Sequence, residues 1–341
     1  MNKNPLRLAI LGFGWVARDY MRPAIDACAD TELVAVSSLD LEDCASVIDR
    51  VDAYTNWREM IERDDIDAVY IATPNYLHRE QTLACLHAGK HVLCEKPMAL
   101  TTEDAQAMVG TAEDMGLVYA TAFDQRFHPA HRAMREWVSA GRIGILTQAR
   151  IDYACWLPHD WAADNWRIEQ SKAGGGAIID LAPHGLDLLE TLTGDRIAEL
   201  TLFPQTVVQQ YSVDDGGTLM ARFESGMLAT LHVGYNRPEA LPRRRLELIG
   251  TEGMLQAYNT MGQVAGGTVT YHDTQGEVHD VAFESDTEPF LMQVQNFAAS
   301  ILTDAPPIRR ATDDVRLVAL LQNALLRSSD STSLNTQSVW H

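Results

Sequence analysis

The chain has 341 residues, of which 46% are hydrophobic and 22% are charged, so it has the composition of a globular protein and exceeds the usual size of one hydrophobic core. Its formal net charge of -20 argues against nucleic acid or an anionic membrane as a partner, because like charges repel. No window approaches the run of about 18 apolar residues that a transmembrane helix requires, so we predict a two-domain protein with no membrane partner.

The first 124 residues alternate short apolar runs with segments of helical periodicity. A helix joins the first two runs, which leaves no room for a hairpin turn and is typical of the βαβ unit of a parallel sheet. We therefore predict an N-terminal doubly wound α/β Rossmann domain over residues 1–124. Its expected strands cover residues 6–11, 33–37, 68–73, 91–94 and 118–123, and its expected helices cover residues 15–29, 76–88 and 101–115.

A glycine-rich loop follows the first predicted strand and opens the first predicted helix. In its GxGxxA pattern Gly12 permits a tight turn, Gly14 lets the backbone approach a pyrophosphate, and Ala17 allows close helix–strand packing. The helix N-terminus also offers N–H groups and a positive dipole to phosphates. The loop therefore predicts dinucleotide binding, with contacts from Gly12, Phe13, Gly14, Trp15 and Val16.

The end of the second predicted strand is the position that separates NAD from NADP. An acidic side chain there binds the ribose 2′-hydroxyl, whereas a 2′-phosphate requires that carboxylate to be absent and a cation to be near. Ser38 leaves room for a phosphate, although no Arg or Lys follows it. Asp40 either reaches the ribose or caps the next helix. We predict NAD or NADP as the cofactor, with a slight preference for NADP.

Two later strand ends bring further polar residues to the same edge of the sheet. Thr73, Pro74 and Asn75 follow the strand at 68–73, at the carboxyl edge where ligands bind. Asn75 can hydrogen-bond a ribose or an amide, although Pro-Asn is also common in turns. The tripeptide Glu95-Lys96-Pro97 follows the next strand and delivers a lysine to that edge.

Beyond residue 124 the pattern changes to strands that alternate polar and apolar residues. We expect strands at 146–153, 201–208, 217–224, 227–235 and 244–249, with a hairpin turn at 224–226. Such strands predict an open, mostly antiparallel sheet packed by a few helices. Residues 125–341 are therefore predicted to form a C-terminal α+β domain.

Three consecutive glycines at 174–176 precede an apolar segment that we interpret as the start of a helix. Asp180 is predicted to be its N-cap, with Pro183 tolerated in the first turn. His184 lies four residues after Asp180 on the same helix face, and Asp187 either orients the imidazole or is structural. A histidine beside a carboxylate suits a general base, although this spacing is also typical of helix capping.

Aromatic and basic residues before the glycines are candidates for the substrate pocket. Trp161 and Trp166 can pack on the C–H face of a sugar ring, and Arg167 can donate to hydroxyl groups. Tryptophans are also common in protein cores. Further candidates for the pocket wall are Tyr153, His159 and Tyr235.

Taken together, these motifs resemble the glucose-fructose oxidoreductase, inositol dehydrogenase and rhizopine-catabolism (Gfo/Idh/MocA) family of NAD(P)-dependent dehydrogenases. They occur in family order over roughly residues 6–330. The matching segments are the glycine loop, Ala72-Thr73-Pro74-Asn75 with His78, Glu95-Lys96-Pro97, Arg126-Phe127-His128-Pro129, Trp166-Arg167, the three glycines, Asp180 with His184, and Gly250-Thr251-Glu252-Gly253. The resemblance implies that His78, Glu95 and Lys96 join the cofactor site, and that Pro97 commonly follows a cis peptide bond.

The resemblance implies an oxidoreductase that transfers a hydride between a secondary alcohol of a sugar, cyclitol or related polyol and NAD(P). It assigns catalysis to Lys96, Asp180 and His184, without deciding whether Lys96 or His184 is the proximal base. The substrate would be bound by Lys96, Arg167, Asp180, His184, Trp166 and Tyr153. A sugar- and cofactor-sensing regulator without turnover and an NAD-assisted glycoside hydrolase are the alternatives. Since the open sheet of this family often forms a subunit interface, a homo-oligomer is implied as well.

The five cysteines follow neither CxxC nor Cys/His ligand spacing. We therefore expect reduced thiols, no metal site and a cytoplasmic protein. Lys3 and Arg7 precede an apolar stretch that could mimic a secretory signal, but two glycines interrupt it.

Overall fold

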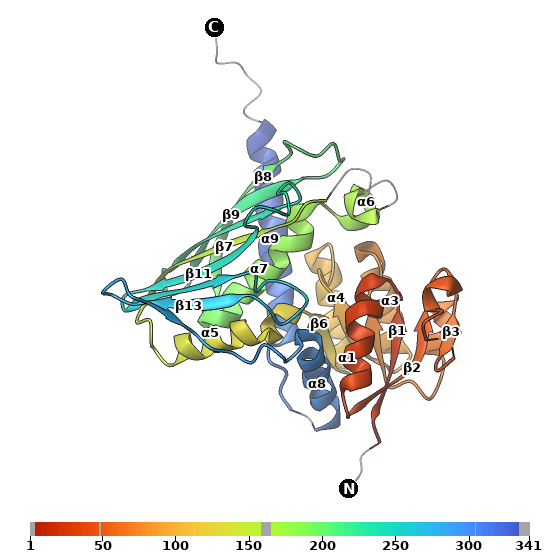
Figure 1. Cartoon of the computed structure of the whole chain (residues 1–341). Coiled ribbons are helices and arrows are strands. Elements are labelled where there is room, and N and C mark those ends of the chain that lie inside the picture. The colour runs from red at the N-terminus through yellow and green to blue at the C-terminus, as the bar shows by residue number, and fades with distance from the viewer. Residues whose placement is uncertain (1–3, 48, 158–164, 304, 334–341) are drawn as a thin grey trace. The chain divides into compact units, whose positions relative to one another are not determined.

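The computed structural model describes residues 4–47, 49–157, 165–303 and 305–333, and the chain divides into two compact units. The first unit combines Met1–Phe127 with Thr287–Val315, and the second combines His128–Asp286 with Arg316–His341. Each unit is built on one β-sheet (Figure 1).

The first unit contains a six-stranded sheet in the order β3-β2-β1-β4-β5-β6. All of its paired strands run parallel, and β4 is buried along its whole length, as expected for a sheet covered on both faces. The strand order reverses at β1, which confirms the predicted doubly wound Rossmann fold. The strands are β1 (Leu6–Leu11), β2 (Thr31–Ser37), β3 (Asp52–Tyr54), β4 (Ala68–Ile71), β5 (His91–Glu95) and β6 (Tyr119–Ala122).

Helical segments connect these strands. The helix predicted at 15–29 forms over residues 15–27 and includes the π-helical stretch η1 (Ala17–Met21) before α1 (Arg22–Ala27). The other helical segments of the first unit are η2 (Leu41–Cys44), α2 (Trp57–Ile61), η3 (Asn75–Leu77), α3 (His78–His87), α4 (Thr102–Asp114), η4 (Asp124–Phe127) and α8 (Pro289–Leu302).

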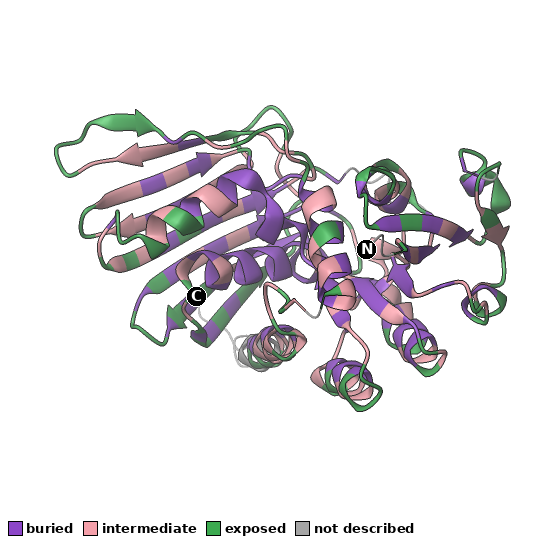
Figure 2. Cartoon of the chain, turned by 90° about the horizontal axis from the view of Figure 1, so that it is seen from below, coloured by how far each residue is buried: buried purple, intermediate pink, exposed green. Residues whose placement is uncertain are grey.

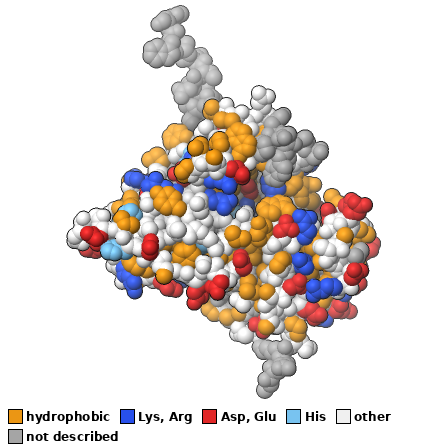
Figure 3. Space-filling model, in the orientation of Figure 1, with side chains coloured by type: hydrophobic (Ala, Val, Ile, Leu, Met, Phe, Trp, Pro, Cys, Tyr) orange, Lys and Arg blue, Asp and Glu red, His pale blue; other side chains and the backbone are white. Residues whose placement is uncertain are grey.

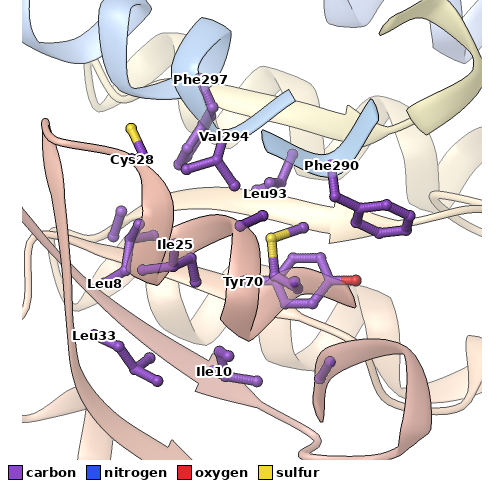
Figure 4. Close-up of a cluster of buried hydrophobic side chains, with 14 of the residues drawn as sticks. Leu8, Ile10, Ile25, Cys28, Leu33, Tyr70, Leu93, Phe290, Val294 and Phe297 are labelled. Carbon is purple, nitrogen blue, oxygen red and sulfur yellow. The ribbon is translucent and has the colours of Figure 1, made fainter. Parts of the chain in front are cut away.

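The core of the first unit is completed by α8, which comes from near the end of the chain. Phe290, Val294 and Phe297 of this helix are buried in one cluster with side chains of the Rossmann elements, among them Ile25, Tyr70 and Leu93 (Figure 4). The predicted division at residue 124 differs from the observed units in this respect, because residues 287–315 are grouped with the first unit. The physical reason is that the apolar face of α8 is buried in the first unit's core.

The second unit contains an eight-stranded sheet in the order β14-β13-β12-β11-β7-β10-β9-β8. Only β7 and β10 pair in parallel, and the remaining pairs are antiparallel, which confirms the predicted open, mostly antiparallel sheet. The strands are β7 (Leu146–Ala154), β8 (Ile197–Gln205), β9 (Gly216–Phe223), β10 (Leu228–Gly234), β11 (Arg244–Gly250), β12 (Gly253–Tyr258), β13 (Thr268–His272) and β14 (Val278–Asp280).

Helices pack on one face of this sheet and leave the other face open. α7 (Ala177–Thr193) contacts β7, β9 and β10, and side chains of these strands alternate between buried and accessible positions (Figure 2). The part of α9 (Ala311–Ser333) that belongs to this unit is tied to β8, since Arg327 Nη2 donates to the carbonyl oxygen of Leu200 at 2.8 Å. The other helical segments are α5 (Pro129–Ser139), η5 (Trp166–Ile168) and α6 (Gln170–Ala173).

Asp and Glu side chains are scattered over the face shown in Figure 3 rather than gathered into one patch. Among the described residues, no helix combines the length and the hydropathy needed to cross a bilayer.

Candidate active site

The glycine loop at the end of β1 has the geometry that a dinucleotide requires. Gly12 has φ +94°, and a Cβ there would lie 2.8 Å from the backbone of Ala72, so glycine is required by the turn and by close strand packing. A Cβ at Gly14 would meet no protein atom within 4 Å. Packing therefore does not require glycine at position 14, whereas leaving room for a pyrophosphate does, and the loop fits a dinucleotide.

The other loop residues point in different directions. The side chain of Phe13 is fully buried in the core of the first unit, so only its backbone can face a cofactor, and its N–H donates to the carbonyl oxygen of Ser37 at 3.1 Å. Trp15 is 40% exposed and its ring contacts Tyr20 edge-on at 5.9 Å between centroids. Val16 is partly buried and packs against the same core.

The end of β2 carries acidic groups near the predicted ribose position. Ser38 Oγ donates to Asp43 Oδ2 at 2.6 Å. Asp40 caps η2 by accepting a hydrogen bond from the N–H of Glu42 at 2.9 Å, so its capping role is the one observed. Arg18 is the basic side chain that interacts electrostatically with Asp43, but its guanidinium is bound to Asp19 at 2.7 Å.

His78 joins the two loops that were predicted to contact the cofactor. Its ring nitrogens lie 2.9 Å from the carbonyl oxygens of Thr73 and Pro97, and the side chain has no exposed surface. Burial lowers the His78 pKa. His78 therefore joins the backbone of Thr73 to that of Pro97, and a direct contact with the cofactor stays a prediction.

Glu95 and Lys96 follow β5 at the carboxyl edge of the sheet. Tyr70 Oη donates to Glu95 Oε1 at 2.6 Å, and the N–H of Lys96 donates to Glu95 Oε2 at 3.3 Å, so the glutamate carboxylate is held by protein donors. The Lys96–Pro97 peptide bond is cis, as the family resemblance implies, and the Lys96 side chain is half-buried.

Asp124 is a buried acid next to this pair that the sequence did not single out. It lies two residues after the end of β6, whose Ala122 pairs with Glu95, and it is 5% exposed. Burial first, and then the charge of Glu95, raises the Asp124 pKa to about 7. The carboxyl edge of the first unit thus holds two acidic groups beside Lys96.

In the second unit, α7 starts earlier than predicted and is capped from elsewhere in the chain. Its N-cap is Gly176, and the carboxylate of Asp214 accepts hydrogen bonds from the N–H groups of Gly176 at 2.7 Å and Ile178 at 2.8 Å. The prediction that Asp180 is the N-cap is therefore wrong: Asp180 lies in the first turn, and Pro183 lies further inside the helix. A remote carboxylate supplies the cap, which leaves Asp180 available for another role.

Asp180 and His184 each lie beside a buried tyrosine. Tyr235 Oη donates to Asp180 Oδ2 at 2.7 Å, and the ring of Tyr153 contacts the His184 ring edge-on at 5.9 Å between centroids. His184 is 7% exposed and Asp187 is fully buried. Asp180 and His184 thus lie one turn apart on α7, with Tyr153 beside His184, and their part in a substrate site stays a prediction.

Trp166 and Arg167 lie in η5. The Arg167 guanidinium stacks 4.5 Å from the centroid of the Trp166 ring, so one face of this tryptophan is covered by its neighbour. Arg167 also interacts electrostatically with Tyr235, the tyrosine that donates a hydrogen bond to Asp180. Two other sequence candidates, His159 and Trp161, lie outside the described residues.

Sequence reasoning missed the supporting residues. Asp124, Asp214 and the hydroxyl of Tyr235 act on partners that are remote in the sequence or on another strand, and no local motif marks them. Of these three, the sequence pointed only to Tyr235, as a candidate for the pocket wall at the end of the predicted strand 227–235. Within the described part of the chain, no cluster of three or more His, Cys, Asp or Glu side chains could hold a metal ion.

Comparison with known proteins identifies the family. Residues 6–123 match the family described as an oxidoreductase family with an NAD-binding Rossmann fold, and residues 131–256 match the GFO/IDH/MocA C-terminal domain. A 1,5-anhydro-D-fructose reductase from Ensifer adhaerens is 38% identical over 275 residues, which covers 80% of this chain and 81% of the relative. A levoglucosan dehydrogenase from Pseudarthrobacter phenanthrenivorans is 32% identical over 228 residues, covering 59% of this chain and 57% of the relative.

A solved structure shows the same fold over almost the whole chain. The aldose-aldose oxidoreductase from Caulobacter crescentus, complexed with glycerol, superposes with a TM-score of 0.87 at 24% identity and covers 96% of this chain and 98% of that one. The family of the N-terminal match binds NAD, in agreement with the glycine loop. The chain therefore belongs to the Gfo/Idh/MocA family of NAD-binding oxidoreductases, the family that its motifs resemble.

Proposed function

We propose that this oxidoreductase transfers a hydride between a secondary alcohol of a sugar, cyclitol or related polyol and NAD(P). The observation that supports this most directly is the placement of Asp180 and His184 one turn apart on α7. The same chain has Lys96 directly after the Rossmann strand β5. The names of the relatives, which refer to anhydrofructose and levoglucosan, support a sugar or a similar polyol as the substrate.

The proposed roles follow from the chemistry of each side chain. In oxidation the alcohol carbon loses a hydride and its oxygen loses a proton, so a C–H and an O–H bond break and a C=O bond forms. Bound NAD(P) supplies the hydride acceptor. Lys96 and His184 together stabilise the developing charge on the alcohol oxygen and manage its proton, and Asp180 accepts a hydrogen bond from a substrate hydroxyl.

The remaining contacts are proposed from their positions. The cofactor is held by the loop Gly12, Phe13, Gly14, Trp15 and Val16, by the strand ends with Ser38, Asp40, Thr73, Pro74 and Asn75, and by Glu95 and Lys96, with His78 supporting two of these loops. Arg167, Trp166 and Tyr153 orient the substrate together with Asp180 and His184.

For the cofactor we propose NAD in preference to NADP, in place of the slight preference for NADP derived from the sequence. The hydroxyl of Ser38 is bound to the carboxylate of Asp43, so an acidic group stands where a 2′-phosphate would need a cation. Arg18, a basic side chain that interacts with Asp43, is already paired with Asp19.

We further propose a cytoplasmic homo-oligomer, a dimer or tetramer. All five cysteines lie among the described residues and none is in a disulfide, which supports a reducing compartment. The open face of the second unit's sheet exposes Phe203, Met220 and Leu228, and an exposed apolar surface supports a subunit contact there.

The decisive test is the turnover of Lys96→Ala. The purified wild type is screened against sugars and cyclitols with NAD and with NADP, and reduced nicotinamide is measured by its absorbance. With the best substrate, Lys96→Ala should lower kcat by roughly 100-fold because stabilisation of the alcohol oxygen is lost, while cofactor affinity measured by fluorescence titration stays nearly unchanged. Wild-type turnover in this variant would exclude the proposed role of Lys96.

A further inference from the structure

One buried hydrogen bond in the second unit connects a proposed substrate-binding residue to a side chain outside the family motifs. Tyr235 Oη donates to Asp180 Oδ2 at 2.7 Å, and Tyr235 is 2% exposed. The charge-assisted hydrogen bond from a phenol to a carboxylate is among the stronger ones in proteins and fixes the direction of its acceptor.

The backbone of Tyr235 is itself held on both sides. Its N–H donates to the carbonyl oxygen of Asp215 at 2.8 Å, and its carbonyl oxygen accepts from Gln209 Nε2 at 3.0 Å and from the N–H of Leu157 at 3.1 Å. The hydroxyl therefore approaches Asp180 from a fixed point rather than from a mobile loop.

The two adjacent aspartates 214 and 215 anchor both partners of this hydrogen bond. Asp214 caps α7, the helix that carries Asp180, through its carboxylate. Asp215 holds Tyr235 through its carbonyl oxygen, and its Oδ2 accepts from three successive N–H groups at positions 207–209, at 3.0, 2.6 and 2.9 Å. One dipeptide thus fixes the start of the helix relative to the tyrosine.

The electrostatics keep Tyr235 a hydrogen-bond donor. Burial first, and then the charge of Asp180, raises the Tyr235 pKa well above its usual value, against the opposing effect of Arg167. The phenol therefore retains its proton near neutral pH and can donate its hydrogen bond to the carboxylate. Through this hydrogen bond it can orient the carboxylate.

We propose that Tyr235 is a positioning residue: its hydroxyl sets the orientation of the Asp180 carboxylate, and through it the hydrogen bond from Asp180 to a hydroxyl group of the sugar or polyol. This inference rests on the proposed function, in which Asp180 binds the substrate. It adds a residue that acts on the reaction only through Asp180.

A double-mutant cycle tests this dependence, because two residues that act as one unit have non-additive effects. The variants are Tyr235→Phe, Asp180→Asn and the double variant, and the readout is kcat/KM for the best alcohol substrate, with kcat and KM reported separately. Tyr235→Phe should lower kcat/KM by roughly 10- to 100-fold in the wild-type background, the size of a lost hydrogen bond to a charged group. In the Asp180→Asn background the further loss should be much smaller, because the amide oxygen accepts only a weaker, neutral hydrogen bond from Tyr235.

Two controls separate positioning from general damage. Tyr271→Phe removes another hydroxyl of the same unit, one that donates to the backbone carbonyl of Glu252 at 2.7 Å on the remote strand β13, and should leave kcat/KM unchanged. Cofactor affinity and the thermal melting curve of Tyr235→Phe should remain close to those of the wild type, because phenylalanine fills the same volume.

Each outcome decides between the explanations. Equal losses in both backgrounds would mean that Tyr235 acts on the fold or on the substrate directly, and would overturn the inference. A wild-type rate in Tyr235→Phe with a slow Asp180→Asn would overturn the inference alone and leave the proposed function standing. A wild-type rate in Asp180→Asn would remove the proposed role of Asp180, and the inference with it.

Discussion

Ser38 shows how a single hydroxyl changes an interpretation made from residue types alone. In the sequence it is a small, neutral residue that leaves room for a phosphate. In the structure the Ser38 hydroxyl donates a hydrogen bond to the carboxylate of Asp43, five residues later. The negative charge of Asp43 therefore lies beside Ser38. The sequence gives the residue type at position 38 directly. The hydrogen-bond partner of Ser38, in contrast, depends on the path of the loop that follows β2.

Reversing the charge at position 43 should shift the cofactor preference. Asp43→Arg removes a carboxylate from the ribose site and supplies a cation for a 2′-phosphate. The ratio of kcat/KM for NADP to that for NAD should rise by about tenfold or more, which corresponds to about 1.4 kcal/mol. Asp64→Arg, an equal charge change at an exposed position of the same unit, is the control, and an equal rise there would show that only net charge matters.

Asp124 should make the stability of the protein depend on pH. Burial and then the Glu95 charge raise its pKa to about 7, against about 3.9 in an unfolded chain. Between these values the folded state binds more protons than the unfolded state, so the free energy of unfolding falls as pH rises from about 4 to about 7. The effect is at most about 4 kcal/mol.

The measurement for Asp124 is a series of thermal unfolding curves across this pH range. The wild-type melting temperature should decline as pH rises through the window, while Asp124→Asn, which cannot ionise, should lose that decline. The groups that interact with Asp124 (Tyr70, Glu95, Lys96 and Gln125) are unchanged in the variant. Parallel curves for the two proteins would contradict the assignment.

At the scale of elements, the sequence predicted strands and helices well where the apolar pattern of a segment is enough to indicate which of its residues are buried. Five of the six strands of the Rossmann sheet are short apolar runs that the sequence predicted, whereas the short, accessible strand β3 was missed. The start of α7 was not predictable in this way, because its cap comes from Asp214, 38 positions after Gly176. The strands β12, β13 and β14 were missed for a related reason: they are short and partly exposed.

A methyl group at Gly176 should disrupt the start of α7. A Cβ there would overlap the carbonyl oxygen of Asp214, so Gly176→Ala must displace the cap or the helix. We expect a loss of about 2 kcal/mol or more in the free energy of unfolding, in the range of overpacked sites, together with lower kcat/KM because Asp180 moves with the helix. Urea unfolding and steady-state kinetics measure both.

Gly110→Ala is the matched control for this substitution. Gly110 lies inside α4, and a Cβ there would meet no other atom within 4 Å. Alanine is favoured over glycine in a helix by about 0.8 to 1 kcal/mol, so this variant should be slightly more stable than the wild type. Comparable destabilisation of both variants would show that crowding at Gly176 is not the cause.

At the scale of the whole molecule, composition and motif order predicted two sheets of the right types. They did not predict how the chain is shared between the units. The open face of the eight-stranded sheet also needed the structure, since the register aligns exposed positions of β8, β9 and β10 into rows: Met220 pairs with Thr201 and Thr230, and Phe203 pairs with Thr218. These rows place apolar side chains among polar ones, as at many subunit interfaces.

If this face joins subunits, a charge on it should weaken the assembly. Met220 is 53% exposed, and Met220→Arg should lower the mass measured by light scattering toward that of a single chain, because a cation would be buried without a partner. Met115→Arg, on an accessible methionine of the first unit, should leave the mass unchanged. A wild-type protein that is already monomeric would exclude the proposed oligomer.

The position of α8 in the first unit also affects the order in which the protein can fold during synthesis. Residues 4–127 leave the ribosome first, yet Phe290, Val294, Phe297 and Ala298 belong to the hydrophobic cluster of that unit. Part of the apolar surface of the nascent Rossmann sheet therefore stays uncovered until α8 is translated. This happens only after the entire sequence of the second sheet. Domains that are continuous in sequence can complete folding from the N-terminus onward, whereas this first unit becomes complete only after residues 287–315 have been translated.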